Sequence, residues 1–138
     1  MKHSSRDQER RNQERGAAAV EFAIVLPLLI VLVFGIVQFA IAYNRVQGLH
    51  AAAREGARLA SLPQTTQGDI DARVSSSLAG VALNGSPTIS VSPDAARPCQ
   101  GRSGQTVTVT VTAVTDFDVP LWGEVSKTLT GKGEFRCE

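Results

Sequence analysis

The sequence predicts an α+β protein: a long N-terminal transmembrane helix continuing into an extracytoplasmic amphipathic helix, then a short second helix and a small three-stranded antiparallel sheet. Three observations support this class. The only long apolar run of the 138-residue chain lies near its start, a stretch of alternating valine and threonine lies in its second half, and two cysteines flank that stretch. We expect four regions: a basic leader (1–16), a transmembrane helix (17–43), its outer continuation (44–62) and a head domain (63–138).

The leader is almost wholly polar. Residues 1–15 contain no apolar residue after Met1, so they cannot bury a face and we expect them to be disordered. Five Lys and Arg residues precede the apolar run and three follow it closely. The more basic flank of a membrane helix stays inside, which predicts a cytoplasmic N-terminus and an extracytoplasmic head in a single-pass membrane protein.

The apolar run itself is long enough to cross a membrane. From Ala17 to Tyr43 the only charged residue is Glu21, and about 27 residues make roughly 40 Å of helix. Pro27 lies inside this run and removes one helical hydrogen bond, so we expect a kink there. A secretory signal cleaved after Ala42 is the alternative, but its apolar region would span only about 7 to 15 residues.

The helix should continue past the membrane. No proline or turn cluster appears between Tyr43 and Leu62, so the helix is expected to run to residue 62 and end at Pro63. A second, short helix should begin after Thr66 as its N-cap and stop at Gly80. The outer part of the long helix is amphipathic, and its small residues allow another backbone to approach closely: Ala51, Ala52, Ala53, Gly56, Ala57 and Ala60.

The head is expected to hold a sheet. Period-two alternation of β-branched residues predicts strands at 88–92, 105–114 and 127–137, joined as an antiparallel meander whose valine face covers the outer helix. This pairing returns Cys137 to the start of the central strand, near the loop that carries Cys99. An oxidising environment outside the membrane permits a disulfide there, and closing that loop would stabilise the fold by roughly 4 kcal/mol. Free thiols are the alternative.

Catalytic and cofactor-binding patterns are missing from the sequence. His3 lies in the leader, and His50 has no Cys, Asp or second His at ligand spacing, so we expect it to be a solvated helix residue. The net charge is +1, without a concentrated basic face or a glycine-rich phosphate loop. We therefore expect no enzyme activity, cofactor, metal site, nucleic-acid binding or small-molecule substrate. Trp122 should pack over the sheet edge or rest at the membrane interface, and the alternative is a binding role in the loop between the strands.

Glu21 needs an explanation, because a charged side chain at the bilayer centre costs roughly 2.5 to 3.5 kcal/mol on insertion scales. Taken alone, its carboxylate could extend to the interface and pair with Arg15. However, Gly16 stands at the junction of leader and apolar run, and Glu21 is the fifth residue after it, followed by Phe22. This spacing resembles the type IV prepilin signature, in which a peptidase cleaves after the glycine.

That resemblance implies roles for four residues. Gly16 and Ala17 would form the processing site, with Ala17 as the mature N-terminus, and Glu21 with Phe22 would direct processing and assembly. The new ammonium of one subunit would pair with the Glu21 carboxylate of a neighbour, which offsets the cost of burying both charges. Ala17 departs from the pattern of many type IV pilins, which have an aromatic residue there.

Residues 14–62 resemble more closely the TadE-like family of Tad or Flp pilus systems. The similarity rests on Gly16, the Glu-Phe pair, the Leu-Pro at 26–27 and the alanine-rich AREGAR sequence at 53–58. It implies a pseudopilin or minor pilin that acts in assembly of a Tad/Flp type IV pilus or a related secretion system, in the cell membrane or in a surface filament.

The same resemblance implies a set of partners: other pilin-like subunits, the inner-membrane pilus assembly machinery, a prepilin peptidase and the lipid bilayer. The alternative is a permanently anchored single-pass membrane protein whose extracytoplasmic domain binds a ligand. In that case Glu21 would only extend to the interface, and Gly16→Leu would leave the size of the protein unchanged.

Overall fold

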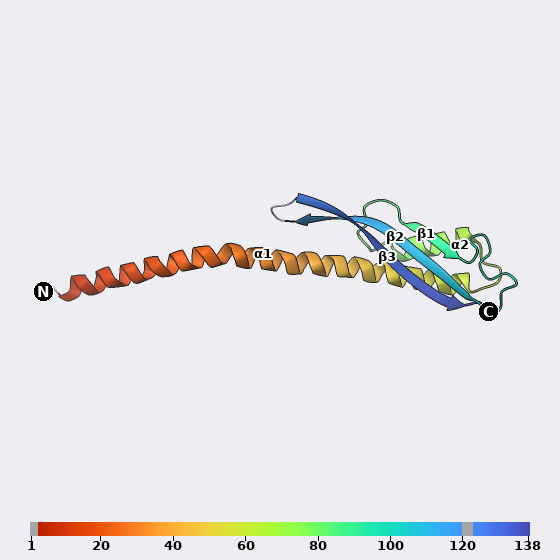
Figure 1. Cartoon of the computed structure of the whole chain (residues 1–138), viewed down its shortest axis with the longest axis horizontal. Helices are drawn as coiled ribbons and strands as arrows, with labels where there is room; N and C mark the ends of the chain where they lie inside the picture. Colours follow the sequence, from red (N-terminus) through yellow and green to blue (C-terminus); the bar gives the residue numbers. More distant parts are fainter. Residues whose placement is uncertain (1–2, 120–122) are drawn as a thin grey trace. The chain divides into compact units, whose positions relative to one another are not determined.

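The computed structural model describes residues 3–119 and 123–138, and the chain divides into two compact units, Met1–Val37 and Gln38–Glu138. Figure 1 shows the elements in chain order, coloured from red to blue. The predicted α+β class is confirmed, since a long apolar helix and a short second helix precede a three-stranded antiparallel sheet. The elements are α1 (His3–Ala60), α2 (Gln67–Ser77), β1 (Thr88–Ser92), β2 (Thr106–Val119) and β3 (Gly123–Arg136).

Helix α1 is 58 residues long and begins within the leader. The prediction of disorder for residues 1–15 is wrong for residues 3–15, which are helical. Glu, Gln and Arg, which dominate this segment, have high helix propensity. Because the apolar helix that follows is already nucleated, each further residue only extends it, and extension is far easier than nucleation.

The helix ends and the second helix begins within a few residues of the predicted points. Helix α1 stops at Ala60, before Pro63, and α2 starts after Thr66, which is the N-cap as expected. A capping box holds this start: the backbone N–H of Asp69 donates to Thr66 Oγ1, and the backbone N–H of Thr66 donates to Asp69 Oδ2 at 3.0 Å. Helix α2 ends at Ser77 with Leu78 as its C-cap, so Gly80 lies beyond its end rather than at it.

The capping box makes the stability of α2 depend on pH. The hydrogen bonds from Thr66 lower the pKa of Asp69 from its usual value near 3.8. A carboxyl group whose pKa is lower in the folded state stabilises the fold above its unfolded pKa, and this contribution is lost as the pH falls through the folded pKa. We therefore expect Asp69→Asn to weaken hydrogen-exchange protection of α2 at pH 7, and the difference from the native chain to shrink below about pH 4. Asp71→Asn, in the same helix turn, is the control and should change protection little at pH 7.

The sheet is a meander in the order β1-β2-β3, with every pair antiparallel. Strand β1 has the predicted bounds, but β2 extends five residues beyond its predicted end at 114, and β3 begins at Gly123 instead of 127. The extension had been obscured by Asp116 and Asp118, since Asp is disfavoured in strands. In the structure Asp116 accepts hydrogen bonds from Asn84 and from Ser126 of the paired strand, which offsets that low propensity.

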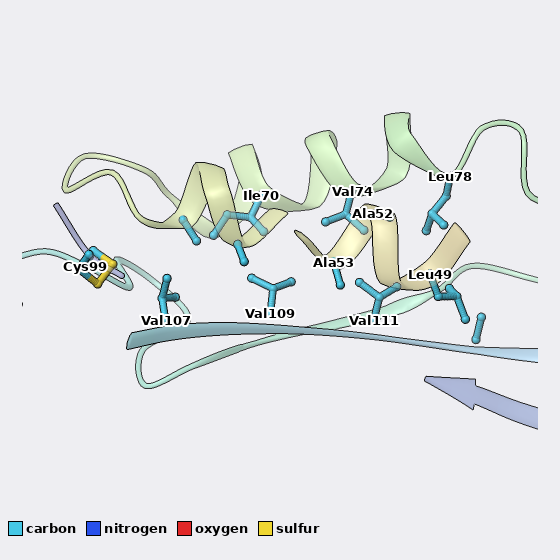
Figure 2. Close-up of a cluster of buried hydrophobic side chains, with 14 residues drawn as sticks. Leu49, Ala52, Ala53, Ile70, Val74, Leu78, Cys99, Val107, Val109 and Val111 are labelled. Atoms are coloured by element: carbon cyan, nitrogen blue, oxygen red, sulfur yellow. A yellow bond between two sulfur atoms is a disulfide. The ribbon is translucent and has the colours of Figure 1, made fainter. Parts of the chain in front are cut away.

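The core lies between the sheet, α2 and the outer part of α1. Figure 2 shows Val107, Val109 and Val111 pointing from β2 toward the two helices, where all three are fully buried. The predicted valine face is therefore the core face. The residues that it joins are Leu49, Ala52, Ala53, Ala57 and Ala60 of α1, Ile70 and Val74 of α2, and Leu78, Cys99, Ala113 and Cys137.

Two glycines of β3 lie directly against the backbone of α1. An added Cβ at Gly131 would lie 2.5 Å from the backbone nitrogen of His50, and one at Gly133 would lie 2.5 Å from the backbone nitrogen of Arg54. Both distances are far inside van der Waals contact. Glycine at these two positions is therefore what permits the strand to lie flat on the helix.

Gly48 and Gly56 of α1 likewise allow side chains from other parts of the head to pack closely against the helix. A Cβ at Gly48 would lie 2.6 Å from Val81 Cγ2, and one at Gly56 would lie 2.6 Å from Val74 Cγ2 of α2. The sequence indicated that another backbone could approach this slim surface. Within the described residues, the elements that do so belong to the chain's own head.

The two cysteines form a disulfide in the structure. Cys99 and Cys137 are joined, with their Cα atoms 5.3 Å apart. Backbone hydrogen bonds fix the ends that the disulfide connects, since Gly104 N–H donates to the carbonyl of Cys137 at 2.9 Å and Cys137 N–H donates to the carbonyl of Gln105 at 2.8 Å. The disulfide closes the end of the sheet where β2 starts and β3 finishes.

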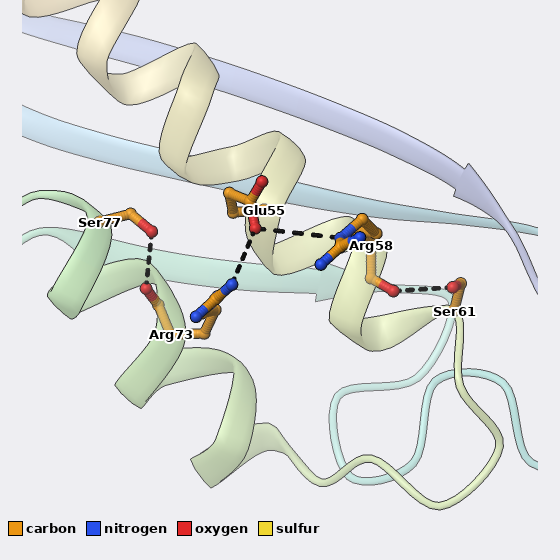
Figure 3. Close-up of polar contacts among 5 residues, drawn as sticks. All are labelled: Glu55, Arg58, Ser61, Arg73 and Ser77. Atoms are coloured by element: carbon orange, nitrogen blue, oxygen red, sulfur yellow. Dashed lines mark hydrogen bonds and ion pairs between the residues drawn. The ribbon is translucent and has the colours of Figure 1, made fainter.

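Polar contacts between the two helices lie at the surface. Figure 3 shows Glu55 of α1 between Arg58 of the same helix and Arg73 of α2, with the Arg73 contact at 3.2 Å and the Arg58 contact at 4.0 Å. Exposed ion pairs of this kind contribute roughly 0 to 1 kcal/mol each. The buried apolar contacts, rather than these pairs, hold α2 on α1.

Candidate functional site

The sequence-predicted processing and assembly residues all lie on α1, in the unit Met1–Val37. Gly16, Ala17, Glu21 and Phe22 are all exposed, and Phe22 retains 65% of its accessible surface. The helix that carries them is long and apolar enough to cross a membrane, and its most apolar part is exposed. These side chains are therefore free to meet lipid or another molecule.

Gly16 has no packing role within the described chain. A Cβ added there would meet nothing within 4 Å, in contrast to Gly131 and Gly133. Glycine inside a helix is less favourable than alanine by roughly 0.5 to 1 kcal/mol. Packing among the described side chains therefore does not require a glycine at this position.

Glu21 is surrounded by apolar residues of its own helix. The positions one turn away, which neighbour it on the helix surface, are Ala17, Ala18, Ile24 and Val25. Arg15 is six residues away, about 9 Å along the axis, beyond the three- or four-residue spacing of helical ion pairs. Among the side chains that the structure describes, which do not include those of residues 1–15, no ion pair includes Glu21.

Pro27 lies inside α1, six residues after Glu21. Proline has no N–H, so the carbonyl of Ala23 lacks the hydrogen bond that an ordinary residue at 27 would donate. The helix assignment continues through this position. The kink expected from the sequence stays a prediction.

A polar cluster near the Val119–Gly123 end of the β2–β3 hairpin was not predicted from the sequence. Arg45 of α1 donates from Nη1 to the carbonyl of Asp116 at 3.2 Å, and its guanidinium lies 5.3 Å from the ring centroid of Phe117. Ser126 Oγ donates to Asp116 Oδ1 at 2.5 Å, and Asn84 donates to Oδ2. These two hydrogen bonds, with a smaller effect of Arg45, lower the pKa of the Asp116 carboxyl group. Arg45 is the first cation after the apolar run, which is the one signal that could have indicated its role.

His50 has a structural contact that the sequence did not predict. Lys132 lies between the two glycines that rest on α1, and its backbone N–H donates to His50 Nδ1 at 3.1 Å. The Lys132 carbonyl lies 3.2 Å from the same nitrogen. The imidazole thus covers the outer edge of β3 at this point, which protects backbone groups that another strand could otherwise pair with.

In the part of the chain that the structure describes, no three His, Cys, Asp or Glu side chains are placed to hold a metal ion. Trp122, expected at the sheet edge or the membrane interface, lies outside the described residues. The chemistry that the described signature residues offer is therefore electrostatic and apolar recognition along α1.

Among the residues that the structure describes, one helix near the N-terminus is long and apolar enough to cross a membrane, and an α+β head follows it; this arrangement indicates the class of single-pass membrane proteins. Residues 16–58 match the model of the TadE-like protein family, so the chain is TadE-like over this segment and the predicted resemblance is confirmed. The match associates the protein with Tad pili as a minor pilin-like component. No curated protein and no solved structure matches the chain significantly.

Proposed function

We propose that this protein is a pseudopilin or minor pilin that acts in assembly of a Tad/Flp type IV pilus or a related secretion system. The observation that carries the proposal is the TadE-like match at residues 16–58, which begins at Gly16 and includes Glu21. The exposed apolar helix supports it, because a subunit of such a system needs a helix that other subunits can pack against.

A prepilin peptidase on the cytoplasmic face cleaves between Gly16 and Ala17 in this proposal. The exposure of Gly16 and Ala17 is compatible with this step, because a peptidase must reach the bond that it cleaves. Cleavage removes the basic leader and converts the nitrogen of Ala17 into a free ammonium at the helix end. The head stays on the extracytoplasmic side, where the environment permits the Cys99–Cys137 disulfide.

The new ammonium of one subunit then pairs with Glu21 of a neighbouring subunit. Glu21 has only apolar neighbours one turn away on its own helix, so an intermolecular cation supplies what its own chain does not. Burying both charges together is far less costly than burying one alone. The pair thereby sets the axial register between neighbouring helices, with other pilin-like subunits and the inner-membrane assembly machinery as partners.

The intact mass of the protein from its native membrane tests the processing step. We expect a chain that starts at Ala17 when the prepilin peptidase is present and an uncleaved chain when it is deleted. Gly16→Leu should give the uncleaved mass even with the peptidase. Gly35→Leu is the matched control, since Gly35 is the other glycine of this unit with nothing within 4 Å of an added Cβ. An uncleaved native chain in the presence of the peptidase would favour a permanent membrane anchor.

A further inference from the structure

Asn84 precedes a glycine in the loop that joins α2 to β1. Of the three asparagines of the sequence, Asn12, Asn44 and Asn84, only Asn84 has this neighbour. Residues 81–87 form neither helix nor strand, and Asn84 and Gly85 are both exposed. Gly85 has a φ of 91°, in the left-handed region that glycine adopts without strain. The backbone at this point is therefore outside the regular hydrogen-bonded structure of the head.

The backbone nitrogen of Gly85 is accessible to the side chain that precedes it. Within the described residues, the hydrogen bonds of the loops and caps do not include the Gly85 N–H. Glycine has no Cβ, so no side chain of its own crowds this nitrogen. Asparagine is among the chemically labile residues of proteins. Its side-chain amide carbon can react with the following backbone nitrogen, and the absence of a side chain on that residue favours the reaction.

The side-chain amide of Asn84 also makes a contact that depends on its being neutral. Its Nδ2 donates to Asp116 Oδ2, while Ser126 Oγ donates to Oδ1 of the same carboxylate at 2.5 Å. Arg45 of α1 donates to the backbone carbonyl of Asp116 at 3.2 Å. Through Asp116 the loop is thus attached to the hairpin near its Val119–Gly123 end. A carboxylate in place of the Asn84 amide could not donate this hydrogen bond.

We propose that Asn84 is a site of spontaneous deamidation, and that the product detaches the loop from Asp116. The Gly85 nitrogen attacks Cγ of Asn84 and forms an N–Cγ bond. The Cγ–Nδ2 bond breaks, and Nδ2 leaves as ammonia with the proton from the Gly85 nitrogen. Water then opens the cyclic succinimide at either carbonyl, which gives aspartate or an isoaspartate whose main chain runs through Cγ. The reaction consumes one water and releases one ammonia, without a change of oxidation state.

Both products have a negative charge where Asn84 has a neutral donor. Two carboxylates then face each other at Asp116, and like charges at this distance repel. The Arg45 guanidinium nearby offsets part of the repulsion but cannot replace the lost donor. Because the ammonia is lost to solvent, the change is not reversed, and the detached form accumulates with the age of the molecule. This inference depends neither on membrane anchoring nor on a role in a pilus.

Deamidation is measured on the full chain in detergent micelles, with the Cys99–Cys137 disulfide oxidised, over days in mildly alkaline buffer. Peptide masses report the exchange of the amide for a carboxylate, and methylation by an isoaspartyl methyltransferase reports the isoaspartate. We expect Asn84 to react faster than Asn44 by an order of magnitude or more. Asn44 is also exposed, but it lies within α1 before Arg45, whose nitrogen is part of the helix. Loss of the Asn84 amide no faster than that of Asn44 would show that the proposal is wrong.

Two variants test the attack by the Gly85 nitrogen. Gly85→Ala places a methyl group beside this nitrogen and should slow the reaction severalfold. Because alanine is strained at a φ of 91°, Asn84→Gln is the second variant. Glutamine keeps the amide but must close a larger ring, so its amide should survive far longer. Equal rates in the native chain and in both variants would mean direct hydrolysis of the amide, which contradicts the proposed step.

The structural consequence is measured separately with Asn84→Asp, which has the charge of the product. We expect hydrogen exchange of the amides in residues 113–119 and 123–129 to become severalfold faster at neutral pH, with little change at Val107, Val109 and Val111. Asn84→Ala removes the donor without adding a charge, so it should have a smaller effect in the same residues. Native exchange rates in Asn84→Asp would show that the contact with Asp116 does not hold the loop, and the second half of the proposal would be wrong.

Discussion

Gly131→Ala should lower the free energy of unfolding of the head by about 3 kcal/mol, the upper end of the range for overpacking a well-packed core. The added methyl group would meet the carbonyl group of Leu49 and lie 2.5 Å from the backbone nitrogen of His50. These are backbone atoms of a helix, so they cannot rotate away as a flexible side chain would. Either β3 must separate from α1 or the helix must shift, and both changes break contacts throughout the core.

Hydrogen exchange of the β2 and β3 amides in the full chain measures this effect, because protection of core strands reports opening of the whole head. A loss of 3 kcal/mol corresponds to a fall in protection of about a hundredfold. Gly80→Ala is the matched control, since a Cβ at Gly80 meets nothing within 4 Å. Unchanged protection in Gly131→Ala would show that β3 does not lie on the helix backbone.

The close approach of β3 and α1 also shows where sequence reasoning stopped. The small residues of the outer helix were visible in the sequence, and they correctly indicated that another backbone could come near. Which backbone comes near depends on how the strands pair. The need for glycine at 131 and 133 is evident only once β3 is known to pack against Leu49 and Ala53 of α1. A one-residue change of register would turn both glycines away from the helix.

The strands show the same division between local and long-range information. Strand β1 and the valine-rich part of β2 were predicted because alternation of β-branched residues is a local signal. The end of β2 was missed because Asp116 is a poor strand residue by itself. Its hydrogen bonds to Asn84 and Ser126, and the contact of Arg45 with its carbonyl, join residues far apart in the sequence.

The candidate assembly site could be predicted from the sequence because its signal is local. Gly16, Glu21 and Phe22 form a short linear pattern that does not depend on the fold of the head, and the TadE-like match covers the same residues. The structure adds that a Cβ at Gly16 would meet nothing within 4 Å and that Glu21 has apolar neighbours one turn away on its helix. By contrast, a contact between residues far apart in the chain, such as that of His50 with Lys132, leaves no pattern in the sequence.

Glu21→Ala should leave membrane insertion intact and strongly reduce pilus assembly. Removing a carboxylate from an apolar helix makes insertion easier, since a charged residue within a span opposes insertion, most strongly at the centre and less toward the end, where Glu21 lies. In the assembled state the same change leaves the ammonium of a neighbouring Ala17 buried without its partner, which is destabilising by about 3 to 5 kcal/mol. Assembly is measured as the amount of pilus sheared from cells, or as complex formation with a second pilin-like subunit in membranes.

Glu21→Gln distinguishes charge from shape at this position. It keeps the size and hydrogen-bonding capacity of the side chain but removes the charge, so we expect it to assemble poorly as well. Glu21→Asp keeps the charge and should retain part of the assembly. Cleavage after Gly16 must be verified by intact mass in each variant, because loss of processing would reduce assembly by a different route. Normal assembly of a cleaved Glu21→Ala chain would show that no ammonium depends on this carboxylate, and the helices of neighbouring subunits would then be held in register by their apolar surfaces alone.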